Sequence, residues 1–177
     1  LCKVPQICPH FHLSLQSGCD ETLKRMNRHY TTALYLEKCG ILRQYFDRPA
    51  LTTDVIVGFP GETEEEFAQT ERFLETVHFS DMHIFKYSKR KGTRAAVMPD
   101  QVPEQTKTKR SEQLISLGHD MSAEVRKYYI GKTDEVLFEE KTVIGDKEYF
   151  IGYTKEYVKV AKDTEENLEN QIISGRI

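Results

Sequence analysis

The chain has 177 residues, 38% of them hydrophobic and 30% charged, with no tryptophan. This composition is typical of a globular protein with one domain, or one domain and a small appendage. No apolar run approaches the roughly 20 residues of a transmembrane helix, and no signal peptide with a basic start and an apolar core is recognisable. We therefore expect a cytoplasmic protein without a membrane partner. The net charge of −3 argues against a protein that coats nucleic acid unspecifically.

The beginning of the sequence, LCKVPQICPH, reads like the interior of a protein, so we expect a fragment or a processed chain. The four cysteines all lie in the first quarter, at Cys2, Cys8, Cys19 and Cys39. Their spacing matches neither a zinc ribbon nor the closely spaced triplet of many iron–sulfur sites. Reduced thiols are the simplest interpretation, because nothing else indicates secretion.

The first two thirds of the sequence alternate between strand and helix patterns, which predicts parallel β/α units. The segment HFHLSLQ alternates as a short strand, with His12, Ser14 and Gln16 on one face. A short helix follows, and Ser17 or Asp20 is its expected N-cap.

Two further helices and two further strands continue this pattern. An apolar helical pattern covers residues 31–46, and the near-continuous apolar run LTTDVIVGF predicts a strand covered on both faces. Thr63 and Glu66 then form a capping box at the start of the next helix. Phe67, Thr70, Leu74 and Val77 are its expected inward stripe. The third strand is DMHIFKYS.

The pattern changes at Gly131. A loop over residues 89–102 leads to a long helix from Pro103 to about Ile130, which Gly131 ends. Beyond it, TDEVLFEEKTV, KEYFIGYT, YVKVAK and QIISGRI predict a small all-β barrel that is one strand short. We therefore predict two parts, 1–130 and 131–177. The second part has 7 Lys+Arg and 11 Asp+Glu, hence a charge of −4.

Candidate ligand contacts lie where the predicted parallel strands end, at residues 16–18, 58–61 and 87–90. Gly58 and Gly61 either make a tight turn or let a ligand approach the backbone. Asp54 is a carboxylate inside an apolar strand, which is costly unless it is paired or hydrogen-bonded. It is either a buried partner of a basic residue or an acceptor for ligand hydroxyls.

The charged residues after the second strand have simpler interpretations. Glutamates 62, 64, 65 and 66 are expected to be solvated in a first helical turn, where they complement the helix dipole. The basic stretch KYSKRKGTR is either a solvated turn or a contact for phosphate or carboxylate. The six histidines form no evident metal site, and no motif supports a nucleophilic mechanism.

Three segments in this order, HFHLSLQSGCDETLKRMNRHYT, TTDVIVGFPGETEEEF and IFKYSKRKGTRA, resemble the radical S-adenosylmethionine (SAM) tRNA methylthiotransferases. The resemblance is to the later half of their radical SAM domain, and the β module resembles the TRAM domain, an OB-like barrel. MNRHYT is similar to the branch that modifies N6-threonylcarbamoyladenosine at position 37, beside the anticodon; the isopentenyladenosine branch is the near alternative. The implied fold is the C-terminal half of a (β/α) TIM-type barrel followed by the small β barrel.

The resemblance also implies which residues contact SAM: Gln16, Arg28, Asp54, Val57, Gly58, Phe59 and Tyr87. Gln16 would contact the nucleoside, Arg28 the methionyl carboxylate and Asp54 the ribose hydroxyls. Residues 57–59 would line the adenine side, and Tyr87 would bound the pocket on the next strand.

The implied reaction inserts sulfur at C2 of the adenine and methylates it. It uses one SAM as methyl donor, another as the source of a deoxyadenosyl radical, and two 4Fe–4S clusters. The radical cluster needs three cysteines in Cys-x-x-x-Cys-x-x-Cys spacing and the auxiliary cluster three more, and the four cysteines here fit neither set. We therefore expect the cluster ligands to lie outside this chain and the chain alone to be inactive.

The implied macromolecular partner is the tRNA anticodon stem-loop. Its expected contacts are Lys89, Arg90 and Lys91 in the basic stretch, and Lys155, Lys159, Lys162 and Arg176 in the β module. The half-barrel's open sheet edge also predicts self-association. Two alternatives remain, a fragment of the ribosomal-protein methylthiotransferase branch and an RNA-binding adaptor without a catalytic half.

Overall fold

The structure is a computed structural model that describes residue 4 and residues 6–177; Cys2 lies outside the described residues. The chain divides into two compact units. One is Phe11–Ala123, and the other is Glu124–Ile177 with the described residues up to His10. The division falls inside the long helix, whereas the change from helix to strands comes at Gly131.

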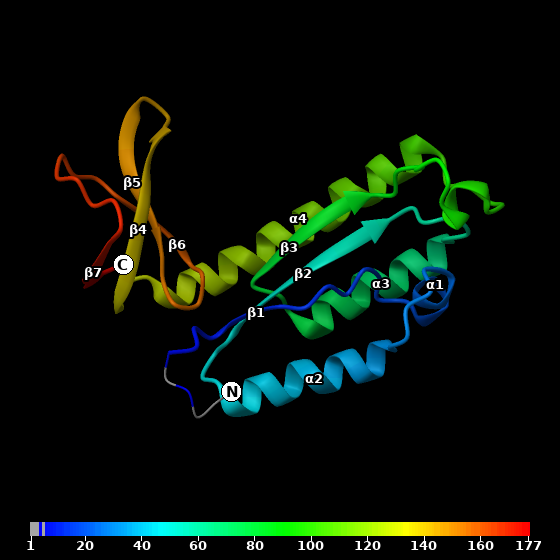
Figure 1. Ribbon diagram of the computed structural model, residues 1–177, viewed down its shortest axis with the longest axis horizontal. Coiled ribbons are helices and arrows are strands. Elements are labelled where there is room, and N and C mark those ends of the chain that lie inside the picture. The colour runs from blue at the N-terminus through cyan, green and yellow to red at the C-terminus, as the bar shows by residue number, and fades with distance from the viewer. Residues whose placement is uncertain (1–3, 5) are drawn as a thin grey trace. The chain divides into compact units, whose positions relative to one another are not determined.

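Strands and helices alternate in the larger unit (Figure 1). The elements are β1 (His10–His12), α1 (Asp20–Arg25), α2 (Thr32–Tyr45), β2 (Ala50–Val57), α3 (Glu64–Val77), β3 (Asp81–Lys86), a 3-10 turn (Arg94–Val97) and the part of α4 (Glu104–Tyr129) up to Ala123. The strands form a sheet of order β1-β2-β3, in which β2 and β3 run parallel. The predicted parallel β/α units are therefore confirmed.

The first strand is shorter than predicted, but its backbone continues along β2. The Leu13 N–H donates to the Thr52 carbonyl at 2.9 Å, and the Gln16 N–H donates to the Asp54 carbonyl at 2.8 Å. Gln16 then makes an isolated parallel bridge with Val55. Gln16 has a positive φ of 70°, a left-handed conformation that interrupts the regular strand.

The core of this unit lies between one face of the sheet and the helices. Leu51, Val55 and Val57 of β2 are fully buried, as alternation along a strand requires when one face is covered. The inward stripe predicted for α3 is confirmed, because its buried residues are Phe67, Thr70, Leu74 and Val77. Leu114 of α4 joins the same cluster.

The buried face of α2 differs from its apolar pattern. Tyr35 and Cys39 are buried, whereas Leu34, Ile41 and Tyr45 are exposed. The Tyr35 hydroxyl donates to the Leu13 carbonyl at 2.6 Å, so a residue with a polar tip ties this helix to the strand segment.

The helix starts confirm one capping prediction and correct another. The capping box of Thr63 and Glu66 is present at the start of α3. For α1 the N-cap is Cys19, which makes no side-chain cap bond, so the expectation of Ser17 or Asp20 was wrong. Each expected cap has other partners: the Ser17 hydroxyl lies 3.2 Å from that of Thr70, and the Asp20 carboxylate accepts from the Thr32 N–H at 2.7 Å.

The four predicted β segments are all strands: β4 (Thr133–Ile144), β5 (Lys147–Tyr153), β6 (Lys159–Lys162) and β7 (Gln171–Arg176). They form an antiparallel sheet of order β6-β5-β4-β7. Val136, Phe138, Phe150 and Leu168 form its buried cluster. Gly131, with φ +82°, follows α4 as predicted.

Among the residues that the structure describes, no helix is both long and apolar enough to span a bilayer.

Candidate functional site

The carboxyl ends of the three parallel segments bring most of the predicted cofactor residues to one edge of the sheet. Gln16 pairs with β2 two residues before its end, and the Tyr87 N–H donates to the Val57 carbonyl at 2.9 Å. The Phe59 and Tyr87 rings meet edge to face, with centroids 5.3 Å apart. The Val57 side chain is fully buried on the helix-covered face, so only its main chain lies at this edge.

Gly58 is required by both its conformation and its surroundings. Its φ is +72°, which glycine adopts without a steric penalty. A Cβ at this position would lie 2.1 Å from Cγ of Lys107. The space beside this glycine is therefore filled by a side chain of α4.

A buried ion pair holds the turn that follows β2. The Glu62 and Arg110 side chains are 1% and 4% exposed, and Arg110 Nη1 lies 2.7 Å from Glu62 Oε2. The same oxygen accepts the Gly58 N–H at 2.6 Å. Burial raises the pKa of Glu62, although the Gly58 N–H and Arg110 both favour its ionised form.

The expectation that all four glutamates are solvated was therefore wrong for Glu62. It was also wrong for Glu66, whose half-buried carboxylate lies 2.5 Å from Arg25 Nη2. Burial acts to raise the pKa of Glu66, but the hydrogen bond from Arg25 and the capping N–H of Thr63 outweigh it, and the pKa is lowered. Glutamates 64 and 65 are exposed, as expected.

Two residues of α4 that the sequence interpretation missed, Lys107 and Arg110, pack against the strand ends. Lys107 is 7% exposed; its Nζ donates to the Tyr87 carbonyl at 3.0 Å and also pairs with Glu104. A signal for them existed, because extending the apolar stripe of α4 backwards from Leu114 at 3-to-4 spacing reaches Arg110 and Lys107.

Asp54 is half-buried, with 29% of its side chain exposed, so the expectation of deep burial was wrong. It lies on the face of β2 opposite to Val55, away from the helix-side core. Its Oδ2 lies 3.2 Å from His12 Nε2, and Ser14 Oγ donates to the same oxygen at 3.2 Å. Asp54 is thus paired with a histidine of β1.

Arg28 lies in the loop after α1 and is exposed. Burial raises the pKa of Tyr30, and the positive charge of Arg28 acts in the opposite direction. The Tyr30 hydroxyl donates to the carbonyl of Leu15, at 2.9 Å, immediately before Gln16. Tyr30 thus links the loop that carries Arg28 to this end of the strand.

The strand-end residues fit a polar organic cofactor. The Tyr87 hydroxyl oxygen is buried and has no hydrogen-bond partner among the described residues. An unsatisfied buried hydroxyl is unfavourable, and a ligand group can satisfy it. Within the described ranges, no group of three or more His, Cys, Asp or Glu is placed so that it could hold a metal ion. Cys8, Cys19 and Cys39 are free thiols.

The predicted RNA contacts differ in how available their charges are. Lys89, Arg90 and Lys91 are exposed in the loop that follows β3. In the β module, Lys155 Nζ lies 2.7 Å from Glu135, so it must exchange this partner to bind phosphate. Lys159 is exposed on β6.

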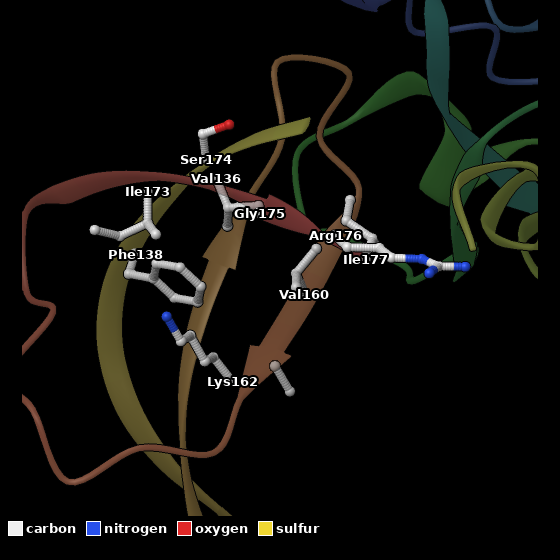
Figure 2. A pocket seen from close by; sticks show the side chains of 10 residues that line it. Val136, Phe138, Val160, Lys162, Ile173, Ser174, Gly175, Arg176 and Ile177 are labelled. Carbon is white, nitrogen blue, oxygen red and sulfur yellow. The ribbon is translucent and has the colours of Figure 1, made fainter. Parts of the chain in front are cut away.

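A pocket of about 260 Å³ lies in the β module and involves the two remaining cations (Figure 2). Val136, Phe138, Val160 and Ile173 contribute its apolar lining. The Lys162 side chain extends toward this lining, whereas the guanidinium of Arg176 points away from it (Figure 2).

Known proteins resemble this chain in sequence and in fold. The family model described as the radical SAM superfamily matches residues 1–74. Among solved structures, the chain is similar to coproporphyrinogen III oxidase (HemN) from Escherichia coli, described as a radical SAM enzyme. The TM-score is 0.56 at 14% identity, over 83% of this chain and 41% of that one, which shows a shared fold.

Curated relatives match almost the whole chain. It is 40% identical, over 97% of its length, to the threonylcarbamoyladenosine tRNA methylthiotransferase MtaB of Bacillus subtilis. It is 41% identical, again over 97%, to the tRNA-2-methylthio-N(6)-dimethylallyladenosine synthase of Acetivibrio thermocellus. The chain spans 38% and 36% of the lengths of these two relatives. With the radical SAM match at its start, this similarity shows that the chain belongs to the MiaB/MtaB-like family.

Proposed function

We propose that this chain is part of a tRNA methylthiotransferase that inserts sulfur at C2 of N6-threonylcarbamoyladenosine at position 37 of tRNA and methylates it. Its cofactors are SAM and two 4Fe–4S clusters, whose ligands lie outside this chain. The observation that carries the proposal is the meeting of Gln16, Phe59 and Tyr87 at one sheet edge, with the Tyr87 hydroxyl buried and, among the described residues, unpaired. In parallel β/α folds this edge is where ligands bind.

The residue roles are those that the family resemblance implies, and the side-chain chemistry suits them. When bound, SAM supplies the methyl group and the radical chemistry of the family. Phe59 offers an apolar surface to the adenine, and Gln16 offers both a donor and an acceptor to the nucleoside. Asp54 accepts from ribose hydroxyls, and Arg28 pairs with the methionyl carboxylate. The β module is a TRAM-like barrel that, with the basic stretch, binds the anticodon stem-loop.

Mass spectrometry of tRNA nucleosides from a strain lacking the gene tests the substrate. We expect the methylthio form of N6-threonylcarbamoyladenosine to disappear and its unmodified precursor to accumulate, with both reversed by the wild-type gene. Loss of methylthio-isopentenyladenosine instead would assign the protein to the other tRNA branch. If both nucleosides persist, the tRNA proposal is wrong, and the ribosomal-protein and adaptor alternatives remain.

The basic stretch provides a prediction about tRNA binding. Replacing Lys89, Arg90 and Lys91 with glutamine should weaken tRNA binding and flatten its salt dependence, because fewer counterions are released. The slope of log K against log salt should fall by roughly 0.7 to 0.9 for each phosphate that the variant no longer neutralises. Filter binding or fluorescence anisotropy over a series of salt concentrations measures this slope.

A matched variant controls for the loss of three positive charges. Lys38, Arg72 and Lys109 are exposed on α2, α3 and α4. Their replacement by glutamine should change the salt slope little. An equal change in both triple variants would mean that net charge matters and that the basic stretch is a solvated turn.

A further inference from the structure

Asp54 belongs to a hydrogen-bonded group of four side chains that spans two neighbouring segments of the sheet. His12 lies at its centre, with Nδ1 3.1 Å from Thr52 Oγ1 and Nε2 3.2 Å from Asp54 Oδ2. The Ser14 hydroxyl lies 3.2 Å from the same imidazole nitrogen and donates to the same carboxylate oxygen. Every member therefore contacts at least one other, and the imidazole contacts all three.

The chemistry of these groups assigns the proton on the imidazole. An ionised carboxylate can only accept, so Nε2 must carry the hydrogen that it donates to Asp54. When the ring is neutral, Nδ1 is an acceptor, and the Thr52 hydroxyl can donate to it. One tautomer satisfies both ring nitrogens, and the bond to Thr52 fixes the ring orientation, as a second partner of a histidine commonly does.

The two oxygens of the Asp54 carboxylate are used differently. The bonds from His12 and Ser14 both end on Oδ2. Within the described ranges, Oδ1 has no hydrogen-bond partner. The Asp54 side chain is 29% exposed to solvent. The protein thus holds one oxygen and leaves the other available.

We propose that His12 and Ser14 are positioning residues, which hold Oδ2 so that Oδ1 is presented to the ribose hydroxyls of SAM. The proposal rests on the proposed function, in which Asp54 is the ribose acceptor. A carboxylate that is already oriented loses less conformational freedom when the ligand binds, and this improves affinity without a direct contact.

Calorimetric titration of SAM into the full-length, cluster-loaded protein measures the affinity for SAM and so tests the positioning role of His12 and Ser14. Asp54→Ala should weaken binding about 10- to 100-fold, because a charged hydrogen-bond acceptor is lost. His12→Phe should weaken binding roughly 5-fold, because it removes the donor to Oδ2 and keeps an aromatic ring. His12→Gln places an amide N–H at similar reach and should recover most of the affinity. Ser14→Ala should have a smaller effect than His12→Phe, since His12 remains.

His83 provides a matched control for the His12 substitution. It lies on β3 with its ring centroid 6.3 Å from that of His12, and among the described residues no hydrogen bond links it to Asp54. His83→Phe should leave the affinity for SAM unchanged. Equal losses for His12→Phe and His83→Phe would mean that the aromatic change disturbs this face of the sheet generally, and the positioning role would be refuted.

A double-mutant cycle distinguishes action through Asp54 from direct contact with the ligand. In the Asp54→Ala background, His12→Phe should cause no further loss of affinity. A similar loss in both backgrounds overturns the proposal, as does an Asp54→Ala variant that binds SAM normally. Either of these results leaves the tRNA nucleoside test unaffected, so the failure of this inference is separable from the failure of the proposed function.

Discussion

The Arg110→Ala variant is expected to lose about 3–5 kcal/mol of unfolding free energy, because it leaves the buried Glu62 carboxylate without its partner. Arg110 also donates to the Glu62 carbonyl at 3.1 Å and to the exposed Glu64 at 2.8 Å. The substitution thus removes three hydrogen bonds at the turn that follows β2. Urea denaturation followed by circular dichroism measures the loss.

The deficit of this variant should also depend on pH. Burial already holds the Glu62 pKa above its ordinary value, and removing Arg110 raises it further. A raised pKa in the folded state favours folding below the ordinary pKa, and this contribution is lost as the pH rises through the raised value. The deficit of Arg110→Ala should therefore be smaller in acid than at neutral pH.

Arg72→Ala is the matched control, since it removes the same side chain from an exposed pair. Arg72 and Glu65 are 61% and 71% exposed, so this substitution should cost at most about 1 kcal/mol. Similar losses of unfolding free energy for the two arginine variants would contradict a stabilising role of the buried Glu62–Arg110 ion pair.

A double-mutant cycle of Arg110→Ala and Glu62→Ala should show strong coupling in unfolding free energy, because each single variant leaves the other charge unpaired.

The Gly58→Ala variant is expected to lose about 2–4 kcal/mol, which combines backbone strain with overpacking. The φ of +72° is unfavourable for alanine, and the new Cβ would overlap the stem of Lys107 rather than its flexible end. Lys107 cannot move freely, because its ammonium group is bound to the Tyr87 carbonyl and to Glu104. Thermal and urea unfolding measure the effect.

Alanine substitutions at two other glycines separate the contribution of backbone strain from that of overlap with Lys107. Gly92 has φ +85°, but a Cβ at this position would have no neighbouring atom within 4 Å, so Gly92→Ala reports strain alone. Gly40, inside α2, has equally open surroundings, and Gly40→Ala should stabilise the helix by up to about 1 kcal/mol. A Gly58→Ala loss no larger than that of Gly92→Ala would show that Lys107 yields without cost.

The local patterns of this chain predicted its elements well. The capping box at Thr63 and the stripe from Phe67 to Val77 depend on neighbours within one helix, and both are present. The parallel β/α rhythm placed Gln16, Phe59 and Tyr87 near one edge of the sheet from the sequence alone, although β1 itself ends at His12. These features depend on hydrogen-bond spacing and side-chain periodicity, which are properties of short segments.

Contacts between distant segments were less predictable. Glu62 shares its sequence context with solvated glutamates, and its partner Arg110 lies 48 positions later. Asp54 was expected to be buried because its neighbours are apolar, yet it lies on the opposite face of β2 from Val55 and Val57. An apolar run does not show which strand face the helices cover.

The sequence by itself determined the order of elements and the membership of the MiaB/MtaB-like family. Only the tertiary structure decided which charges are buried, which oxygen of Asp54 is held by His12 and Ser14, and that α4 supports the turn after β2. The physical reason is that the burial and pairing of a charge depend on which surfaces pack against it, and packing joins residues that the chain keeps far apart.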